Sequence, residues 1–85
     1  MQVKLVYFAW VRERVGKTEE AVDLPEGVAT VADLVRWLKA RGEEYAYAFE
    51  NDGVIRVALD QKHVRADASV LGARELAFFP PMTGG

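Results

Sequence analysis

The chain ends in the stretch ELAFFPPMTGG, residues 75–85. Residues 75–79 predict a β-strand that joins this stretch to the core. Proline lacks an N–H and has a fixed φ, so the diproline at 80–81 prevents further strand pairing and favours polyproline II. No residue from 76 to 84 has a charged side chain. The stretch therefore predicts a strand continued by a slim, neutral tail that reaches roughly 19 Å beyond the sheet, at about 3.1 Å per residue.

The last two residues, Gly84 and Gly85, leave a carboxylate on backbone that has no side chains. Such a thread can enter a channel too narrow for other residues, and glycine accepts the backbone angles that a close approach demands. In a functional tail, the chemistry lies on the α-carboxyl group of Gly85. Small residues also gather at chain ends and in expression scars, so an incidental Gly-Gly is the alternative. We expect a functional tail because the strand anchors it, the diproline stiffens it and the glycines keep its end slim.

Size and composition limit the possible functions. A chain of 85 residues forms one domain with little room for a deep active site. The net charge of −2 is too small to favour nucleic acid or an anionic membrane as a partner. The absence of cysteine excludes disulfides, thiolate catalysis and cysteine-ligated metals. With no signal-peptide layout and no long apolar run, we expect a cytoplasmic protein.

Periodicity and turn signals predict the elements of an α+β domain. We expect strands at 3–9, 18–24, 54–59, 63–65 and 75–79, and one main helix at 30–41. A single helix against a small sheet gives a two-layer architecture. The first and last strands are the most apolar, so we expect them to be neighbours in the middle of the sheet.

The main helix has the clearest signals. Thr30 and Asp33 have the spacing of a capping box, and Gly42 is in the usual place for a glycine that ends a helix. Apolar residues with helical spacing form one stripe, namely Val31, Leu34, Val35 and Leu38.

Other segments are less clear. Residues 43–50 fit either a strand or a helix, and we interpret them as a flap that closes one end of the core. Single helical turns are expected at 10–15 and at 67–71.

The side chains do not form a conventional active site. His63 and Ser69 are the only histidine and the only serine, and with Asp67 they lie too close in sequence to form a catalytic triad. No metal-ligand cluster and no phosphate-binding loop is visible, so we expect neither a metal nor a bound cofactor. The Glu19-Glu20 pair is interpreted as solvated.

The carboxylate of Gly85 must therefore be activated by another protein. Its leaving group would be oxide, so it must first become an acyl adenylate or a similar mixed anhydride. An ATP-using partner is required for this step. The activated group can then take sulfur, giving a thiocarboxylate, or an amine, giving an amide bond to another protein.

The chain resembles the β-grasp, ubiquitin-like sulfur carriers of the MoaD/ThiS family, specifically the MoaD-type small subunit of molybdopterin synthase. The resemblance covers nearly the whole length. It rests on Phe8-Ala9, Arg12-Glu13, Gly16, Leu24-Pro25-Glu26-Gly27 with Thr30-Val31, Val57-Ala58-Leu59-Asp60-Gln61 with Val64, and above all Phe78-Phe79-Pro80-Pro81-Met82-Thr83-Gly84-Gly85.

The resemblance implies a fold and a mechanism. Residues 1–79 form a β-grasp domain with a mixed sheet packed on one main helix, and 80–85 form an extended tail. Gly85 is adenylated by an ATP-dependent enzyme and converted to a thiocarboxylate by a sulfurtransferase system. It then donates sulfur to a cyclic pterin precursor inside the large subunit, in a heterotetramer. The small subunit is thus a sulfur-donating cosubstrate without an active site of its own.

The resemblance also implies particular residues. The partner interface comprises Phe8, Arg12, His63 and Phe79, and the tail comprises Pro80, Pro81, Met82, Thr83 and Gly84. Two stretches depart from the family pattern, because Gly72-Ala73-Arg74-Glu75 replaces a more acidic loop and Asp60 replaces a frequent asparagine. Three alternatives stay open: a protein modifier joined through Gly85 to lysines, a sulfur carrier of another pathway such as thiazole or tungsten-pterin synthesis, and a plain interaction module.

Overall fold

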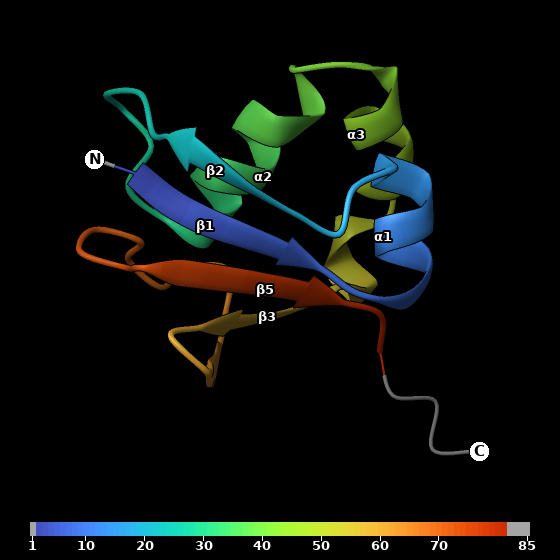
Figure 1. The fold of residues 1–85 in the computed structure, drawn as a ribbon. Helices are drawn as coiled ribbons and strands as arrows, with labels where there is room; N and C mark the ends of the chain where they lie inside the picture. Colours follow the sequence, from blue (N-terminus) through green and yellow to red (C-terminus); the bar gives the residue numbers. More distant parts are fainter. Residues whose placement is uncertain (1, 82–85) are drawn as a thin grey trace.

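The structure is a computed structural model that describes residues 2–81. Its helices gather on one side of a five-stranded sheet and leave the other side open (Figure 1). The elements are β1 (Gln2–Tyr7), α1 (Ala9–Val15), β2 (Glu19–Asp23), α2 (Val31–Lys39), α3 (Glu43–Ala48), the 3₁₀ helix η1 (Asp52–Val54), β3 (Arg56–Leu59), β4 (Lys62–Val64) and β5 (Glu75–Phe79). The predicted α+β class is confirmed.

The sheet has the strand order β2-β1-β5-β3-β4. β1 and β5 pair in parallel, with Leu5 opposite Leu76 and Tyr7 opposite Phe78. The other three pairings are antiparallel. The predicted adjacency of the first and last strands is confirmed, and β5 is the central strand of a mixed sheet.

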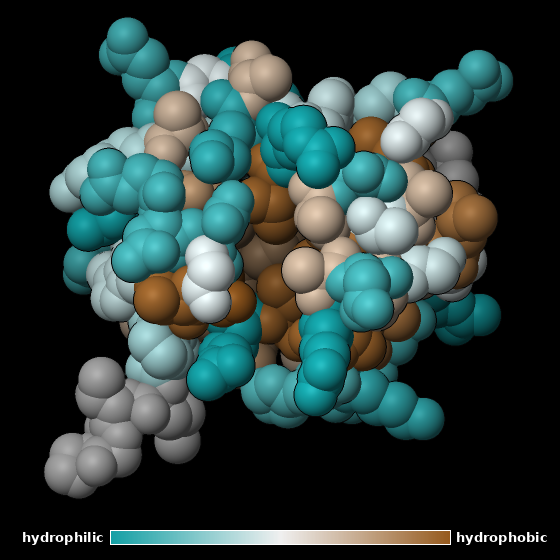
Figure 2. All heavy atoms as spheres, turned by 180° about the vertical axis from the view of Figure 1, so that it is seen from behind, coloured by the Kyte–Doolittle hydropathy of each residue, from teal (hydrophilic) through white to brown (hydrophobic). Residues whose placement is uncertain are grey.

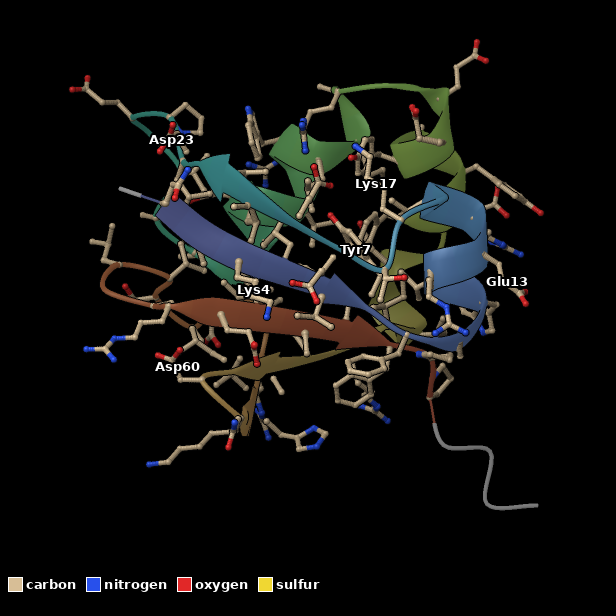
Figure 3. All side chains as sticks on the ribbon, viewed as in Figure 1. Lys4, Tyr7, Glu13, Lys17, Asp23 and Asp60 are labelled. Carbon is tan, nitrogen blue, oxygen red and sulfur yellow. The ribbon has the colours of Figure 1, made fainter. Side chains whose placement is uncertain are left out.

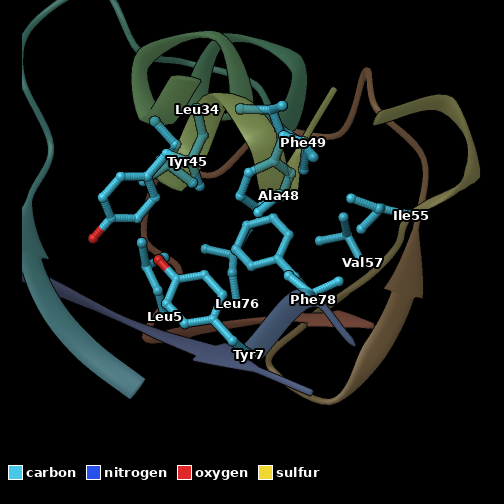
Figure 4. Packing of buried hydrophobic residues seen from close by; sticks show 14 of the residues in the cluster. Leu5, Tyr7, Leu34, Tyr45, Ala48, Phe49, Ile55, Val57, Leu76 and Phe78 are labelled. Carbon is cyan, nitrogen blue, oxygen red and sulfur yellow. The ribbon is translucent and has the colours of Figure 1, made fainter. Parts of the chain in front are cut away.

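Phe78 lies at the centre of the core, between the sheet and the helices (Figure 4). Its ring stacks on Tyr7 at a centroid distance of 5.9 Å and meets the edge of Phe49 at 5.2 Å. All three side chains are fully buried. The stripe predicted for the main helix is also buried, so α2 packs on the sheet as the periodicity indicated.

The capping box at the start of α2 is confirmed. The Thr30 hydroxyl accepts the Asp33 N–H at 3.2 Å, and Asp33 Oδ2 accepts the Thr30 N–H at 3.1 Å. The backbone N–H groups of Ala29 and Thr30 hold the pKa of the Asp33 carboxyl below its usual value. The prediction for Gly42 was wrong, because its φ of 172° is ordinary extended backbone that leads directly into α3.

Residues 43–50 close one end of the core, as predicted, and they do so mainly as the helix α3. Tyr45, Ala48 and Phe49 are buried, which matches a helical spacing, whereas Tyr47 is exposed. α1 is longer than the single turn expected, because Val11 and Val15 are both buried and extend it over seven residues.

The helical turn expected at 67–71 was wrong. The segment instead runs along the start of α2, where Ser69 forms a β-bridge with Thr30. The carbonyls of Ala66 and Ala68 accept the N–H groups of Ala32 and Val31 at 2.9 and 3.0 Å. The first N–H groups of a helix have no acceptor within the helix itself. The carbonyls of this segment provide acceptors for two of them, which a helix at 67–71 would not do.

Glu20 joins β2 to the helices, which contradicts its interpretation as a solvated residue. Its side chain is only 12% exposed. Oε2 accepts hydrogen bonds from the hydroxyls of Tyr7 and Tyr45 at 2.8 and 2.5 Å, and Oε1 accepts one from the Arg41 guanidinium at 3.2 Å. Burial alone would raise the pKa of Glu20, but the hydrogen bonds from the two tyrosines and Arg41 outweigh it and lower this pKa. Burial and the bond to Glu20 together raise the pKa of Tyr7.

The β3–β4 hairpin positions the start of β5. Asp60 and Gln61 both have positive φ, 47° and 73°, as in a type I′ turn. Asp60 Oδ1 accepts the N–H groups of Arg74 and Glu75, each at 3.0 Å. The two stretches that depart from the family pattern therefore contact each other. The contact joins the Asp60 side chain to backbone N–H groups, so it does not depend on which side chain residue 74 has.

Glu20→Gln is expected to lower the free energy of unfolding by about 1–3 kcal/mol at neutral pH, because charge-assisted hydrogen bonds become neutral ones. A carboxyl whose folded pKa is depressed stabilises the fold above its unfolded pKa and loses that contribution as pH falls through the folded pKa. The variant should therefore lose less stability than the parent between neutral and acid pH. Denaturant melts at several pH values test this, with the exposed Glu19→Gln as control. Equal pH dependence in parent and variant would contradict it.

Asp60→Ala is expected to cost about 1–2 kcal/mol of unfolding free energy, because two N–H groups lose their acceptor. Asp60→Asn keeps Oδ1 and should cost clearly less. Chemical denaturation compares the two variants, and equal losses would show that charge rather than hydrogen bonding matters at this position.

Candidate functional site

The root of the tail is rigidly held. β5 pairs with β1 on one side and with β3 on the other. Near the end of β5, the Phe8 N–H donates a hydrogen bond to the Phe78 carbonyl at 3.0 Å. Pro80 and Pro81 follow and are half-buried. Met82, Thr83, Gly84 and Gly85 lie outside the described residues. The chain thus leaves the sheet from its central strand (Figure 1).

Three aromatic rings meet on the open face of the sheet at this root. Phe8 and Phe79 have a centroid distance of 6.1 Å, and His63 and Phe79 have one of 5.2 Å, both with edge-to-face geometry. Phe8 is 45% exposed, whereas Phe79 is half-buried. We call Phe8, His63 and Phe79 the aromatic patch. The structure thus brings together three of the four predicted interface residues.

Strand alternation explains why the patch faces away from the core. Successive side chains of a strand point to opposite faces, and Figure 3 shows Lys4 on the open side of β1 and Tyr7 on the side of the helices. Val6, Ala77 and Ala58 pair across β1, β5 and β3 on the open face. These small and medium side chains form an apolar floor next to the patch.

Arg12, the fourth predicted interface residue, is exposed on α1, and its backbone N–H donates to the Phe8 carbonyl at 3.3 Å. Ala9, between the two, has a φ of 53°, which turns the chain sharply from β1 into α1. Among the described residues, no side-chain hydrogen bond or ion pair links Arg12 to the patch.

The two candidate catalytic side chains, His63 and Ser69, make other contacts in the described part of the chain. Residues 2–81 contain no group of three His, Asp or Glu side chains able to hold a metal ion. His63 packs on Phe79, while the Ser69 hydroxyl accepts the Leu71 N–H at 3.2 Å, so neither is set up as half of a nucleophile–base pair. No helix within this range is long and apolar enough to cross a membrane.

A groove of about 480 Å³ lies on the helix side of the molecule, between α2 and the β3–β4 hairpin. Val35, Ile55 and Val57 line its floor, and Lys39 and Asp52 form an ion pair of 3.5 Å beside it. Figure 2 shows apolar atoms in a hollow on this side, surrounded by hydrophilic side chains. Arg56 and Arg65 also line the groove, whereas the three rings of the aromatic patch do not.

Comparison with known proteins identifies the family. The model described as "ThiS family" matches residues 5–85. The chain belongs to this family. The match begins within β1 and extends to the last residue, so it includes both the aromatic patch and the terminal glycines.

Similar proteins match this chain over nearly its whole length. The chain is 41% identical to the molybdopterin synthase sulfur carrier subunit of Escherichia coli, over 98% of this chain and 99% of that protein. A solved structure of a putative molybdopterin converting factor, subunit 1, from Pyrococcus furiosus is 30% identical, with a TM-score of 0.72 over 96% of this chain and 99% of that one. SAMP1 from Haloferax volcanii, a small archaeal modifier protein, is 28% identical, with a TM-score of 0.73 over the full length of both. The predicted β-grasp fold is confirmed.

The structure adds one residue to the site that the sequence analysis did not name. Arg56 lies directly opposite Phe79 in the β3–β5 ladder and is exposed. Paired residues of a ladder point to the same face, so Arg56 shares the open face with the patch. The sequence could have predicted this position. Ile55, Val57 and Leu59 alternate as core-facing residues of a strand, so residue 56 between them points to the other face.

Phe8→Ala is expected to cost about 1 kcal/mol or less of unfolding free energy, since the side chain is largely exposed. Phe78→Ala should cost about 3–5 kcal/mol, because it leaves a cavity at the centre of the core. Thermal or urea unfolding measures both. Similar losses for the two variants would make Phe8 a core residue and remove it from the exposed patch.

Proposed function

We propose that this chain is a sulfur-carrier small subunit of molybdopterin synthase and that the carboxylate of Gly85 carries the sulfur. Full-length identity of 41% to a protein of that name is the observation that carries the proposal. The family match extends to residue 85, so it includes the group that would react.

The chemistry requires three steps on one carbonyl carbon. An adenylating enzyme transfers AMP from ATP to the Gly85 carboxylate and releases pyrophosphate. The persulfide of a sulfurtransferase displaces AMP, and a thiol reduces the resulting acyl disulfide to the thiocarboxylate, with the thiol oxidised to a disulfide. The thiocarboxylate sulfur then replaces a carbon–oxygen bond of the cyclic pterin precursor, and water hydrolyses the resulting thioester, which leaves the sulfur on the pterin and regenerates the Gly85 carboxylate. The ATP belongs to the adenylating partner, and the reaction is placed in the cytoplasm, where ATP is available.

The proposed partners follow from the same scheme. A synthase subunit works with another subunit, here a large one that accepts the tail, in an assembly of two large and two small chains. The adenylating enzyme and the sulfurtransferase are further partners. Phe8, Arg12, His63 and Phe79 are proposed to contact them. Exposed aromatic rings at the root of the tail support this role, because such side chains anchor interfaces well.

Protein modification is the second candidate. The likeness to SAMP1, a small archaeal modifier protein, favours it. Both candidates use an adenylated Gly85 and differ only in the nucleophile, which is sulfur in one case and a lysine amine in the other. The molybdopterin synthase assignment is preferred because the Escherichia coli relative, 41% identical over the full length, carries that name.

The intact mass of the chain tests the proposal after incubation with its adenylating enzyme, ATP and a sulfur donor. We expect an increase of about 16 Da, the difference between sulfur and oxygen. Deletion of Gly85 should abolish the shift while leaving the unfolding transition unchanged, because the core ends with β5.

The thiocarboxylated chain should then convert the pterin precursor in the presence of the large subunit. Thiocarboxylation without pterin conversion would point to another sulfur pathway. No mass shift, together with Gly85-linked lysine adducts in cells, would establish the modifier role instead.

A further inference from the structure

The cations of this chain fall into two groups. Six of them have a carboxylate oxygen within 4.0 Å, namely Lys4, Arg14, Lys17, Arg36, Lys39 and Arg41. Among residues 2–81 the other cations have no such partner: Arg12, Arg56, Lys62, Arg65 and Arg74. Three of these five lie on β3, on β4 or directly after it, so unpaired positive charge concentrates at that edge of the sheet.

Arg56 has a special place among the unpaired cations. It sits opposite Phe79 in the ladder, on the open face that carries the aromatic patch. His63, opposite Ala58, occupies the same face one strand further out. Arg56 is therefore an exposed, unpaired cation whose strand position is directly opposite Phe79, and it also lines the groove beside α2.

The opposite edge of the same face is acidic. Glu19 and Asp23 of β2 pair with Val6 and Gln2 and share the open face with them. Lys4, between the acidic edge and the patch, is neutralised by Glu19 at 3.1 Å. The open face thus has the carboxylate of Asp23 at its β2 edge, that of Glu75 in the central strand opposite Lys4, and unpaired positive charge at its β3–β4 edge.

We infer that Arg56 is a docking residue for the large synthase subunit, whose surface places a carboxylate next to an apolar socket for the aromatic patch. This inference rests on the proposed function and specifies its partner. An arginine guanidinium forms two parallel hydrogen bonds with a carboxylate, which fixes orientation as well as adding affinity. An acidic group at this point would meet Arg56, whereas the same partner rotated on the sheet would meet the carboxylate of Asp23 and be repelled.

Measured binding of the large subunit tests the inference, with four variants of the full chain. Arg56→Glu reverses the charge beside the patch, and Arg56→Leu removes it while keeping an apolar side chain. Phe79→Asp disrupts the patch itself. Arg74→Glu is the matched control, because Arg74 is also an exposed, unpaired arginine but precedes β5 at the end away from Phe79. Thermal unfolding of each variant verifies that it is folded.

We expect Arg56→Glu to weaken binding roughly tenfold or more, since like charges would face each other, and Arg74→Glu to change it less than about twofold. For the parent, affinity should fall as ionic strength rises from about 0.01 to 0.15 M, where the Debye length shortens from about 30 to 8 Å. Arg56→Leu should reduce this salt dependence. Charge reversal of the contacting carboxylate on the large subunit should restore the binding of Arg56→Glu.

Each contrary result has a distinct meaning. If Phe79→Asp weakens binding and Arg56→Glu does not, the patch docks without Arg56 and the inference is overturned while the proposed function stands. If Arg74→Glu weakens binding as much as Arg56→Glu, the effect is net charge, and the inference is again overturned. If the folded chain with intact Phe79 and Arg56 does not bind the large subunit but is thiocarboxylated at Gly85, the synthase assignment fails and the sulfur-carrier chemistry survives.

Discussion

The parallel pairing of β1 with β5 is the constraint on which the rest of the structure depends. It joins the two ends of the chain and makes the last strand the central one. In a parallel pair, both strands end at the same edge. Phe8, which follows β1, and Phe79, which ends β5, therefore meet beside the point where the tail begins. The fold thus brings the exposed rings to the root of the tail without a dedicated loop.

The two faces of the sheet perform different tasks. The helix-side face is filled by large buried rings and closed by Glu20, whose carboxylate links β2 to α3 through Tyr45. The open face has a floor of small side chains with aromatic rings only at the root of the tail. A small domain has one compact core, and here that core lies entirely on one side of the sheet. The other side is left available for a partner.

The sequence predicted the local features of this fold better than the non-local ones. The five strands, the α2 stripe and the capping box depend on short-range spacing and were confirmed, although the first strand ends at Tyr7 rather than 9 and the third begins at Arg56 rather than 54. The segment 67–71 was misread because its hydrogen bonds go to the start of α2, which local sequence does not reveal. Glu20 was misread for a similar reason, because its partners are distant in sequence or in a loop. They are Tyr7 of β1, Arg41 between α2 and α3, and Lys17 in the loop before β2. The patch was anticipated through the family resemblance, whereas Arg56 required the register of β3 on β5.

The neutral tail cannot select its own partners. Residues 76–84 have no charged side chain, so a channel that accepts a slim diproline and diglycine thread has little else to recognise. Selectivity must therefore come from the sheet face at the root of the tail, where rings and unpaired charge are fixed by strand pairing. The proposed partners all act on Gly85, so they must bind in turn rather than together. Successive binding on one small face favours interfaces of moderate affinity, and charge complementarity suits them because it speeds association and orients the partner without requiring a large buried area.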